Sequence, residues 1–426
     1  NVLFGAVDPQ EDLADFSVVE SNGVTANDNI LQQWRLDYLI ISRTNQILAL
    51  IDEVEFDQDS KDNIKGQALF LRAYAYFELA RYFGSVPLHL TPVGTREEAA
   101  LPLSEEAEIY AQIVMDLEAA VPLLPAKSEQ QAGRVTSGAA RTLLANVFIN
   151  LERWADAEAI LNPVVTSGEY SLIPDYAMAF SDNATNKNNA ESVFEVQFLE
   201  GAAGLNGNFI YQMLPRPLMA EELVEITGTS NPQDLDGEGN NIPTPDIIAA
   251  YEDGDEREDA SIGYVFLSNS FRDDKVYPYI KKYAKKHSQH NNTGTNFPIY
   301  RYSEVLLFMA EALNEQGKDG EALTYLNQIR DRAGLAPASG GGDALRELIF
   351  KERRVELAFE NKRWFDIQRT GRIEEIIVPY GQRIVANPLD YYYPPNQNSK
   401  PRSNVFTNLN KFYALPAAES DLSPYF

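Results

Sequence analysis

Apolar side chains recur every three or four positions through the first and last thirds of the chain. Between residues 32 and 54, Leu and Ile occupy such positions repeatedly. This period places apolar residues on one face of an α-helix. Further helices are expected over residues 62–82, before Gly84, and over residues 104–121, before Pro122, because glycine and proline end helices. The sequence therefore predicts a mainly α-helical protein.

Two segments far apart in the chain predict similar helical hairpins. Residues 143–161 (LLANVFINLERWADAEAIL) have a second helix that starts at Trp154, and residues 306–326 (LLFMAEALNEQGKDGEALTYL) have a turn at Gly317. Both segments carry small residues where two helices would approach closely. This pattern is typical of tetratricopeptide-type repeats, each of which needs neighbours to bury its open face. Two ordinary antiparallel helix pairs are the alternative, and the matched spacing favours the repeat.

The chain between residues 170 and 297 has a different character. Residues 191–199 (ESVFEVQFL) alternate between apolar and polar positions, as a β-strand does. Gly, Asn, Pro and Asp dominate residues 201–208 and 227–245, and long irregular stretches of this kind are often functional loops.

We therefore expect a tetratricopeptide-like helical repeat scaffold, mainly in residues 30–170 and 300–372. An irregular, loop-rich layer with a few short strands should lie over it, mainly in residues 171–299 and 378–426, and should carry the ligand site. Residues 1–426 are expected to form a single domain.

Composition excludes several classes of function. The formal net charge is −27 and the pI is about 4.5, so the chain as a whole repels nucleic-acid phosphates and anionic lipid surfaces. The absence of cysteine excludes disulfides, thiolate nucleophiles and cysteine-based zinc sites. No stretch approaches the roughly 20 apolar residues that cross a bilayer.

Metal sites receive little support from the sequence. His287 and His290 are three residues apart, but their Ser, Gln and Asn neighbours are typical of a loop, and no third histidine is close in the sequence. Residues 234–240 (DLDGEGN) resemble a calcium loop, yet the twelfth position is Pro245, where an EF-hand requires Glu. We predict no metal and no cofactor, and an irregular calcium site stays open.

Three carboxylates, Glu352, Glu356 and Glu360, are spaced four residues apart on a predicted helix. Paired carboxylates can act as acid and base in glycoside hydrolysis. Basic residues lie among them, at Arg353, Arg354, Lys362 and Arg363. Ion pairs one helical turn apart lower a carboxyl pKa, whereas a catalytic acid needs a raised pKa. The pattern therefore predicts a structural ion-pair network.

Several segments, taken in order, resemble the SusD/RagB family of outer-membrane nutrient-binding lipoproteins. Any one of them alone would be weak, but together they extend over most of the chain. They are FLRAYAYFELARYFGSVPL (70–88), AYEDGDERED (250–259), YRYSEVLLFMAEALNE (300–315), LNQIRDRAGL (326–335), ERRVELAFENKRWFDIQRTG (352–371) and ALPAAESDLSP (414–424).

The resemblance implies a non-enzymatic protein at the cell surface that captures oligosaccharide or polysaccharide for a SusC-like TonB-dependent transporter in the outer membrane. It also implies a lipid anchor on an N-terminal cysteine. This chain has none, so we expect the anchor to precede Asn1 and to provide its membrane contact. Peptide capture is the alternative, and a glycoside hydrolase is less favoured because no nucleophile elbow, phosphate loop or metal triad is present.

Sugar binding needs a flat aromatic surface and polar groups around it. Two loop regions supply this mixture, although polar loops also contain Asn and Tyr without binding sugars. The predicted ligand-binding residues are Asn206, Asn208, Tyr211, Tyr264, Asn269, Phe271, Arg272, Tyr277, Tyr279 and Asn292. The run Tyr391–Tyr393 is a further candidate, or else a packed strand edge or a transporter contact.

The tryptophans and a lysine cluster are assigned to other roles. Trp34, Trp154 and Trp364 fall within the predicted scaffold and are expected to pack there. A cluster of lysines could attract an anionic glycan, but we favour a solvated strand face that alternates with tyrosines. These lysines are Lys275, Lys281, Lys282, Lys285 and Lys286.

Overall fold

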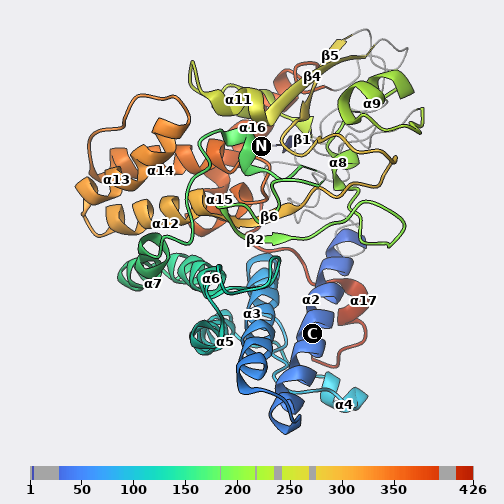
Figure 1. The fold of residues 1–426 in the computed structure, drawn as a ribbon, viewed down its shortest axis with the longest axis vertical. Helices are drawn as coiled ribbons and strands as arrows, with labels where there is room; N and C mark the ends of the chain where they lie inside the picture. The colour runs from blue at the N-terminus through green and yellow to red at the C-terminus, as the bar shows by residue number, and fades with distance from the viewer. Residues whose placement is uncertain are drawn as a thin grey trace. The chain divides into compact units, whose positions relative to one another are not determined.

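The computed structural model forms two compact units (Figure 1). Unit 1 comprises Asn1–Leu13 and Tyr170–Thr407, and unit 2 comprises Ala14–Glu169 and Asn408–Phe426. The expectation of a single domain stays a prediction. The structure describes residues 2–3, 28–182, 184–215, 218–234, 242–267, 275–392 and 409–425.

The regular elements in the described residues of unit 2 are helices, joined by loops. Helix α3 lies at its centre, in contact with both α2 and α5, and α6 packs against α5 and α7. The helices are α2 (Asp28–Leu50), α3 (Gln58–Phe83), α4 (Arg96–Ala99), α5 (Glu106–Ala120), α6 (Ser137–Asn150), α7 (Trp154–Thr166) and α17 (Ala417–Ser420).

The ends of α3 follow from the local sequence. Asp57 caps its start by accepting a hydrogen bond from the Ser60 N–H at 2.8 Å. Gly84 ends it with a φ of +73°, a conformation that costs glycine little. The predicted helix over residues 62–82 is thus confirmed and begins one turn earlier.

Helix α2 is present as predicted, but its apolar residues occupy two faces. Trp34 and Ile41 are buried at 4% and 1% exposure. Leu36, Leu39 and Ile47 are exposed by 55%, 43% and 39%. The periodicity therefore identified the helix without identifying its buried face.

Both predicted helical hairpins are present. In unit 2, α6 and α7 pack together, and α7 begins at Trp154 as expected. In unit 1, α12 (Tyr302–Glu315) packs against α13 (Asp319–Arg332), with Gly317 at φ +73° in the turn. Helix α14 (Gly342–Glu356) packs on both α12 and α13, which extends the stack seen at the side of unit 1 in Figure 1.

The rest of unit 1 consists of short elements and loops. Its strands form three antiparallel pairs in the described residues: β1 (Val2–Leu3) with β3 (Ile242–Pro243), β2 (Ser192–Val196) with β6 (Phe297–Arg301), and β4 (Ile262–Leu267) with β5 (Lys275–Ile280). The strand predicted over residues 191–199 corresponds to β2. The short helices are α8 (Phe209–Gln212), α9 (Ala220–Thr227), α10 (Pro245–Ile248), α11 (Glu256–Ser261) and α15 (Arg363–Arg369).

One boundary of the predicted loop layer needs correction. Helix α16 (Ile373–Ala386) continues past residue 378, where the irregular segment was expected to begin. Pro379 lies within it, at the cost of one backbone hydrogen bond. Ile384 is fully buried near its end, so packing of the apolar face supports the helix despite the proline.

Candidate functional site

A network of buried charges lies in the core of unit 1. Glu356 is fully buried, with carboxylate oxygens 3.1 Å from a nitrogen of Arg257 and 3.1 Å from a nitrogen of Arg301, and it also pairs with Arg332. Burial alone would raise the pKa of Glu356, but the guanidinium groups of Arg332, Arg301 and Arg257 outweigh it and hold that pKa well below its usual range. A structural ion-pair network is confirmed, but its predicted partners are wrong. The cations come from other segments of unit 1, whereas Arg353 pairs with Glu304 and Asp366, and Lys362 pairs with Glu304.

The other two carboxylates of this set join the same network. Glu352 contacts Arg257 at 2.6 Å and Arg330 at 2.9 Å. Glu360 lies beyond the end of α14, not on it, and contacts Arg301 at 2.8 Å. All three carboxylates therefore form ion pairs with buried cations, and the pKa values of Glu356 and Glu360 are lowered by them.

The prediction of a solvated lysine face is wrong at Lys282. This residue is fully buried, and its Nζ donates hydrogen bonds to the Ala358 carbonyl at 2.8 Å and to Glu360 at 2.9 Å. Burial lowers the pKa of Lys282 to about 8. This lysine supports the core of unit 1 and is unavailable to an anionic glycan.

Two loops of unit 1 bring three of the predicted asparagines together. The Gly201 N–H donates to Asn292 Oδ1 at 2.8 Å, and Asn292 Nδ2 donates back to the Gly201 carbonyl at 3.1 Å. Asn206 Nδ2 donates to the Asn291 carbonyl at 3.2 Å, and Asn208 is exposed just before α8. The Asn292 amide thus fastens the loops, while Asn208 faces solvent. Their roles in ligand binding stay predictions.

Tyr211 and Tyr277 require correction as sugar-stacking residues. Tyr211 is 2% exposed, with its hydroxyl 2.8 Å from His287 Nε2 and its ring 4.9 Å from that of His290. Tyr277 is 4% exposed and pairs with Val265 on the inner face of the β4–β5 hairpin. A sugar ring needs an open aromatic face, which neither residue provides.

Among the described residues of unit 1, aromatic side chains are exposed on the outer face of the β4–β5 hairpin. Tyr264 and Phe266 alternate along β4 and are exposed by 53% and 54%. Val276 pairs with Phe266 across the strands and is 49% exposed. Residues opposite or two apart on antiparallel strands share one face of the sheet. We call Tyr264, Phe266 and Val276 the hairpin face.

Sequence reasoning found Tyr264 but missed the other two members of the hairpin face. The alternation of residues 262–267 (IGYVFL) carried the signal, since a period of two places Tyr264 and Phe266 on one side. Tyr279 belongs to the opposite side, where it is half-buried and its ring lies over Gly263. The ring of Tyr279 therefore supports the hairpin from beneath.

Acidic side chains act electrostatically on the hairpin face. Partial burial, together with the carboxylates of Glu258 and Asp259, raises the pKa of the Tyr264 phenol. Tyr264 is therefore neutral at pH 7. The same carboxylates can accept hydrogen bonds from the hydroxyl groups of a ligand stacked on its ring.

The Tyr391–Tyr393 candidate does not form an open platform in its described part. Tyr391 is 5% exposed and Tyr392 is 8% exposed. The Tyr391 hydroxyl donates to Asp246 at 2.6 Å, and Lys275 Nζ lies 5.6 Å from the Tyr392 ring. Both rings are packed within unit 1, but they lie in a turn and not at a strand edge.

Four of the predictions lie outside the described residues. These are the predicted ligand residues Asn269, Phe271 and Arg272, which fall between β4 and β5 in the sequence, and most of the calcium-like segment 234–240. Among the described residues, no group of three or more His, Asp or Glu side chains could hold a metal ion. In the same set, no helix is long and apolar enough to cross a membrane.

The stacked helical hairpins define a scaffold of tetratricopeptide-like repeats, and two family models match the chain. The model described as the SusD family matches residues 267–424. The model described as "Starch-binding associating with outer membrane" matches residues 9–149. The chain belongs to the SusD/RagB family, as its motifs predict.

Individual relatives agree with this assignment. The SusD-like protein P2 of Formosa agariphila is 27% identical over 94% of this chain and 83% of its own length. A SusD-like carbohydrate-binding protein of Bacteroides fragilis has a TM-score of 0.76 at 21% identity, over 98% of this chain and 92% of its own. A laminarin-binding SusD-like protein has a TM-score of 0.70 at 24% identity, over 92% and 84%. These structures share the mainly helical, tetratricopeptide-like fold with few short strands, which confirms the predicted fold class.

Proposed function

We propose that this protein binds an oligosaccharide or polysaccharide at the bacterial outer membrane, without cleaving it, and delivers it to a SusC-like TonB-dependent transporter. The single observation that carries the proposal is the hairpin face, an exposed pair of aromatic rings beside two carboxylates in a chain of the SusD/RagB family. Stacking on rings and hydrogen bonding to carboxylates are the two interactions that a pyranose requires.

Support for glycan as the ligand also comes from the relatives. Solved proteins with this fold are described as carbohydrate-binding and laminarin-binding, and one matching family model as starch-binding in association with the outer membrane. The absence of cleavage is proposed because the motif carboxylates are neutralised by arginines and a lysine.

The ligand class is tested by affinity electrophoresis in gels that contain laminarin, starch or another neutral polysaccharide, followed by calorimetry with those that retard the protein. Retardation by at least one glycan is expected. Binding to peptides with no retention on any glycan would reverse the proposal in favour of peptide capture. Reducing ends released at a catalytic rate would show an enzyme instead.

The hairpin face is tested with the variants Tyr264→Ala and Phe266→Ala. Each should weaken glycan binding by about 1–3 kcal/mol, because each removes a stacking surface. Phe56→Ala is a matched control, since Phe56 is an exposed aromatic residue (39%) in the other unit. Unchanged affinity in both hairpin variants would discard the site while leaving glycan binding intact.

The transporter partnership rests on family membership and has its own test. The tagged protein, expressed in its source bacterium, should co-purify with a TonB-dependent barrel from detergent-solubilised outer membranes. Purification without any such barrel, under conditions that preserve other outer-membrane complexes, would contradict the delivery step.

A further inference from the structure

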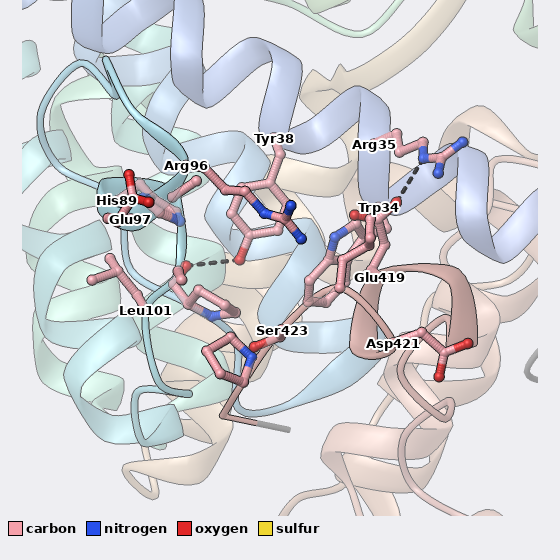
Figure 2. Close-up of a pocket in the computed structure, with 15 residues that line it drawn as sticks. Trp34, Arg35, Tyr38, His89, Arg96, Glu97, Leu101, Glu419, Asp421 and Ser423 are labelled. Carbon is pink, nitrogen blue, oxygen red and sulfur yellow. Dashed lines mark hydrogen bonds and ion pairs between the residues drawn. The ribbon is translucent and has the colours of Figure 1, made fainter.

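Unit 2 contains a cavity of about 900 Å³, and none of the residues assigned to sugar binding from the sequence lines it (Figure 2). It lies between α2, the chain that follows α3, the short helix α4 and the C-terminal segment around α17. Sites for small ligands commonly have volumes of roughly 300–1,000 Å³. Six of its lining residues carry the inference: Trp34, Tyr38, His89, Arg96, Glu97 and Asp421.

One wall of the cavity is aromatic and held in place. The rings of Trp34 and Tyr38 are 4.9 Å apart, and Phe83 meets Trp34 edge-on at 5.1 Å from behind. The Tyr38 hydroxyl donates to the Pro87 carbonyl at 2.7 Å, and the His89 ring meets Tyr38 edge-on at 5.9 Å. These contacts fix the wall before any ligand enters, which lowers the entropic cost of binding.

Polar side chains lie at two edges of the cavity, on the side of α4 and on the side of α17. Arg96 and Glu97 lie on the exposed helix α4, and Asp421 follows α17. Within the part of the chain that the structure describes, none of these three side chains takes part in an ion pair. Figure 2 shows the Arg96 guanidinium directed into the cavity on the side of Tyr38 and Trp34. These side chains therefore offer one charged donor group and two acceptors to a ligand.

The remaining polar groups of the cavity add no net charge. Arg35 and Glu419 pair at 2.7 Å and join α2 to α17. Burial lowers the pKa of His89, so its ring is neutral at pH 7 and can donate at one nitrogen and accept at the other. An anionic ligand would be repelled by the carboxylates of Glu97 and Asp421, and a cationic ligand would be repelled by the Arg96 guanidinium. A neutral ligand with many hydroxyl groups avoids both repulsions and can form hydrogen bonds with all three groups.

We propose that this cavity is a second saccharide site, which takes a neutral sugar residue against the partly exposed ring of Tyr38, with the buried Trp34 ring beside it, and binds its hydroxyl groups through Arg96, Glu97 and Asp421. The inference rests on the proposed glycan-binding function and deepens it. It assigns part of the binding to unit 2, on elements separate in sequence from the hairpin face.

Fluorine NMR of the full chain labelled with 5-fluorotryptophan gives a readout local to this cavity. The protein has three tryptophans, of which only Trp34 lines the cavity, so Trp154 and Trp364 serve as internal references. Assignment uses the three single Trp→Phe variants. The probes are laminarihexaose and maltoheptaose, titrated into the wild-type chain and into the double variant Tyr264→Ala/Phe266→Ala. The Trp34 signal should shift in both chains, while the reference signals stay in place.

The variant Arg96→Ala should raise the sugar dissociation constant, measured from the Trp34 signal, about tenfold, because it removes a charged hydrogen-bond donor. Arg96 is exposed on a four-residue helix, so the variant should fold normally. Arg43→Ala is the matched control, since Arg43 is exposed on α2 and does not line the cavity. It should leave the Trp34 titration unchanged.

The outcomes separate this inference from the function on which it rests. If calorimetry detects glycan binding but the Trp34 signal never moves, the second site is wrong and glycan binding stands. A Trp34 shift that is produced by short peptides, and by neither sugar, assigns the cavity to a peptide and overturns the inference. If neither probe nor any polysaccharide in the gels binds, both proposals fail.

Discussion

At the scale of single residues, the most unusual group in unit 2 is the carboxyl of Asp37. It is 4% exposed and accepts a hydrogen bond from Gln33 at 2.8 Å. Burial is the main reason that its pKa rises from 3.8 to about 8, and the neighbouring Glu78 adds to the rise, while Gln33 and Arg81 oppose it. The folded chain therefore holds a proton that the unfolded chain releases, so this group lowers the free energy of unfolding progressively between about pH 4 and pH 8.

The variant Asp37→Asn should relieve that cost. We expect the free energy of unfolding at pH 8 to rise by about 1–3 kcal/mol, and to change little at pH 4, where Asp37 is protonated in the folded chain and largely so in the unfolded one. Thermal unfolding followed across this range checks the expectation. Asp59→Asn, at an exposed position in the first turn of α3, should give no gain at pH 8 and cost no more than about 1 kcal/mol, because it removes a negative charge near the helix N-terminus. An equal gain at both pH values would point to packing and not to ionisation.

Glu356 illustrates the opposite case, a buried carboxylate that is fully ion-paired. The variant Glu356→Gln should lower the free energy of unfolding by about 3–5 kcal/mol, because Arg257, Arg301 and Arg332 lose part of their countercharge in the core. Chemical denaturation measures the loss. The exposed pair Arg372–Glu375 is the control, and Glu375→Gln should cost no more than about 1 kcal/mol. Similar small losses in both variants would contradict a central role for this network.

At the scale of elements, the β4–β5 hairpin depends on the absence of one side chain. A Cβ at Gly263 would lie 2.3 Å from the Tyr279 ring, far inside any real contact distance. Tyr279 is paired with Gly263 on the neighbouring strand, and its ring lies over the glycine. The ring can take this position only while residue 263 has no side chain. The glycine therefore helps to hold the strand whose outer side carries Tyr264 and Phe266.

The variant Gly263→Ala should destabilise the protein by about 1–3 kcal/mol, because the Tyr279 ring must move away from its position. Thermal unfolding of a double-mutant cycle gives the test. The pair Gly263→Ala/Tyr279→Ala should lose less than the sum of the single losses, since the clash is then absent. Strict additivity would mean that the two residues do not act through this contact.

The same elements show what the sequence can and cannot predict. The start of α7 at Trp154 and the turn at Gly317 were predictable, because helix ends depend on a few local residues. The burial of Tyr277 and the exposure of Val276 were not. Neighbouring residues on a strand point to opposite sides, and only the rest of unit 1 decides which side is covered. For the same reason Tyr211 was assigned to the surface, although it packs against two histidines.

At the scale of the whole molecule, the net charge of −27 constrains the ligand. A neutral glycan experiences little net force from this field, whereas an anionic one is repelled unless it finds a basic site. The burial of Lys282 removes one member of the cluster that could have formed such a site. The charge balance therefore agrees with a neutral ligand at both proposed sites.

Salt dependence tests this view of the ligand. The affinity for a neutral glycan should change less than about twofold between 50 and 500 mM sodium chloride, because no ion pairs form across the interface. Calorimetry with the same polysaccharide at both concentrations gives the comparison. Uronate-containing and sulfated polymers should fail to bind at either. Tight, salt-sensitive binding of a sulfated polymer would show that local lysines outweigh the overall charge.

The pairing of Arg35 with Glu419, at a separation of 384 residues in the chain, has a consequence for the order in which the protein is made. Tyr413 also donates its backbone N–H to the Tyr82 carbonyl at 2.8 Å, so residues after 407 complete a unit that begins with helices before residue 170. On the ribosome, unit 2 must therefore wait until residues 408–426 have been synthesised before it reaches its finished form, although most of its helices are made before unit 1.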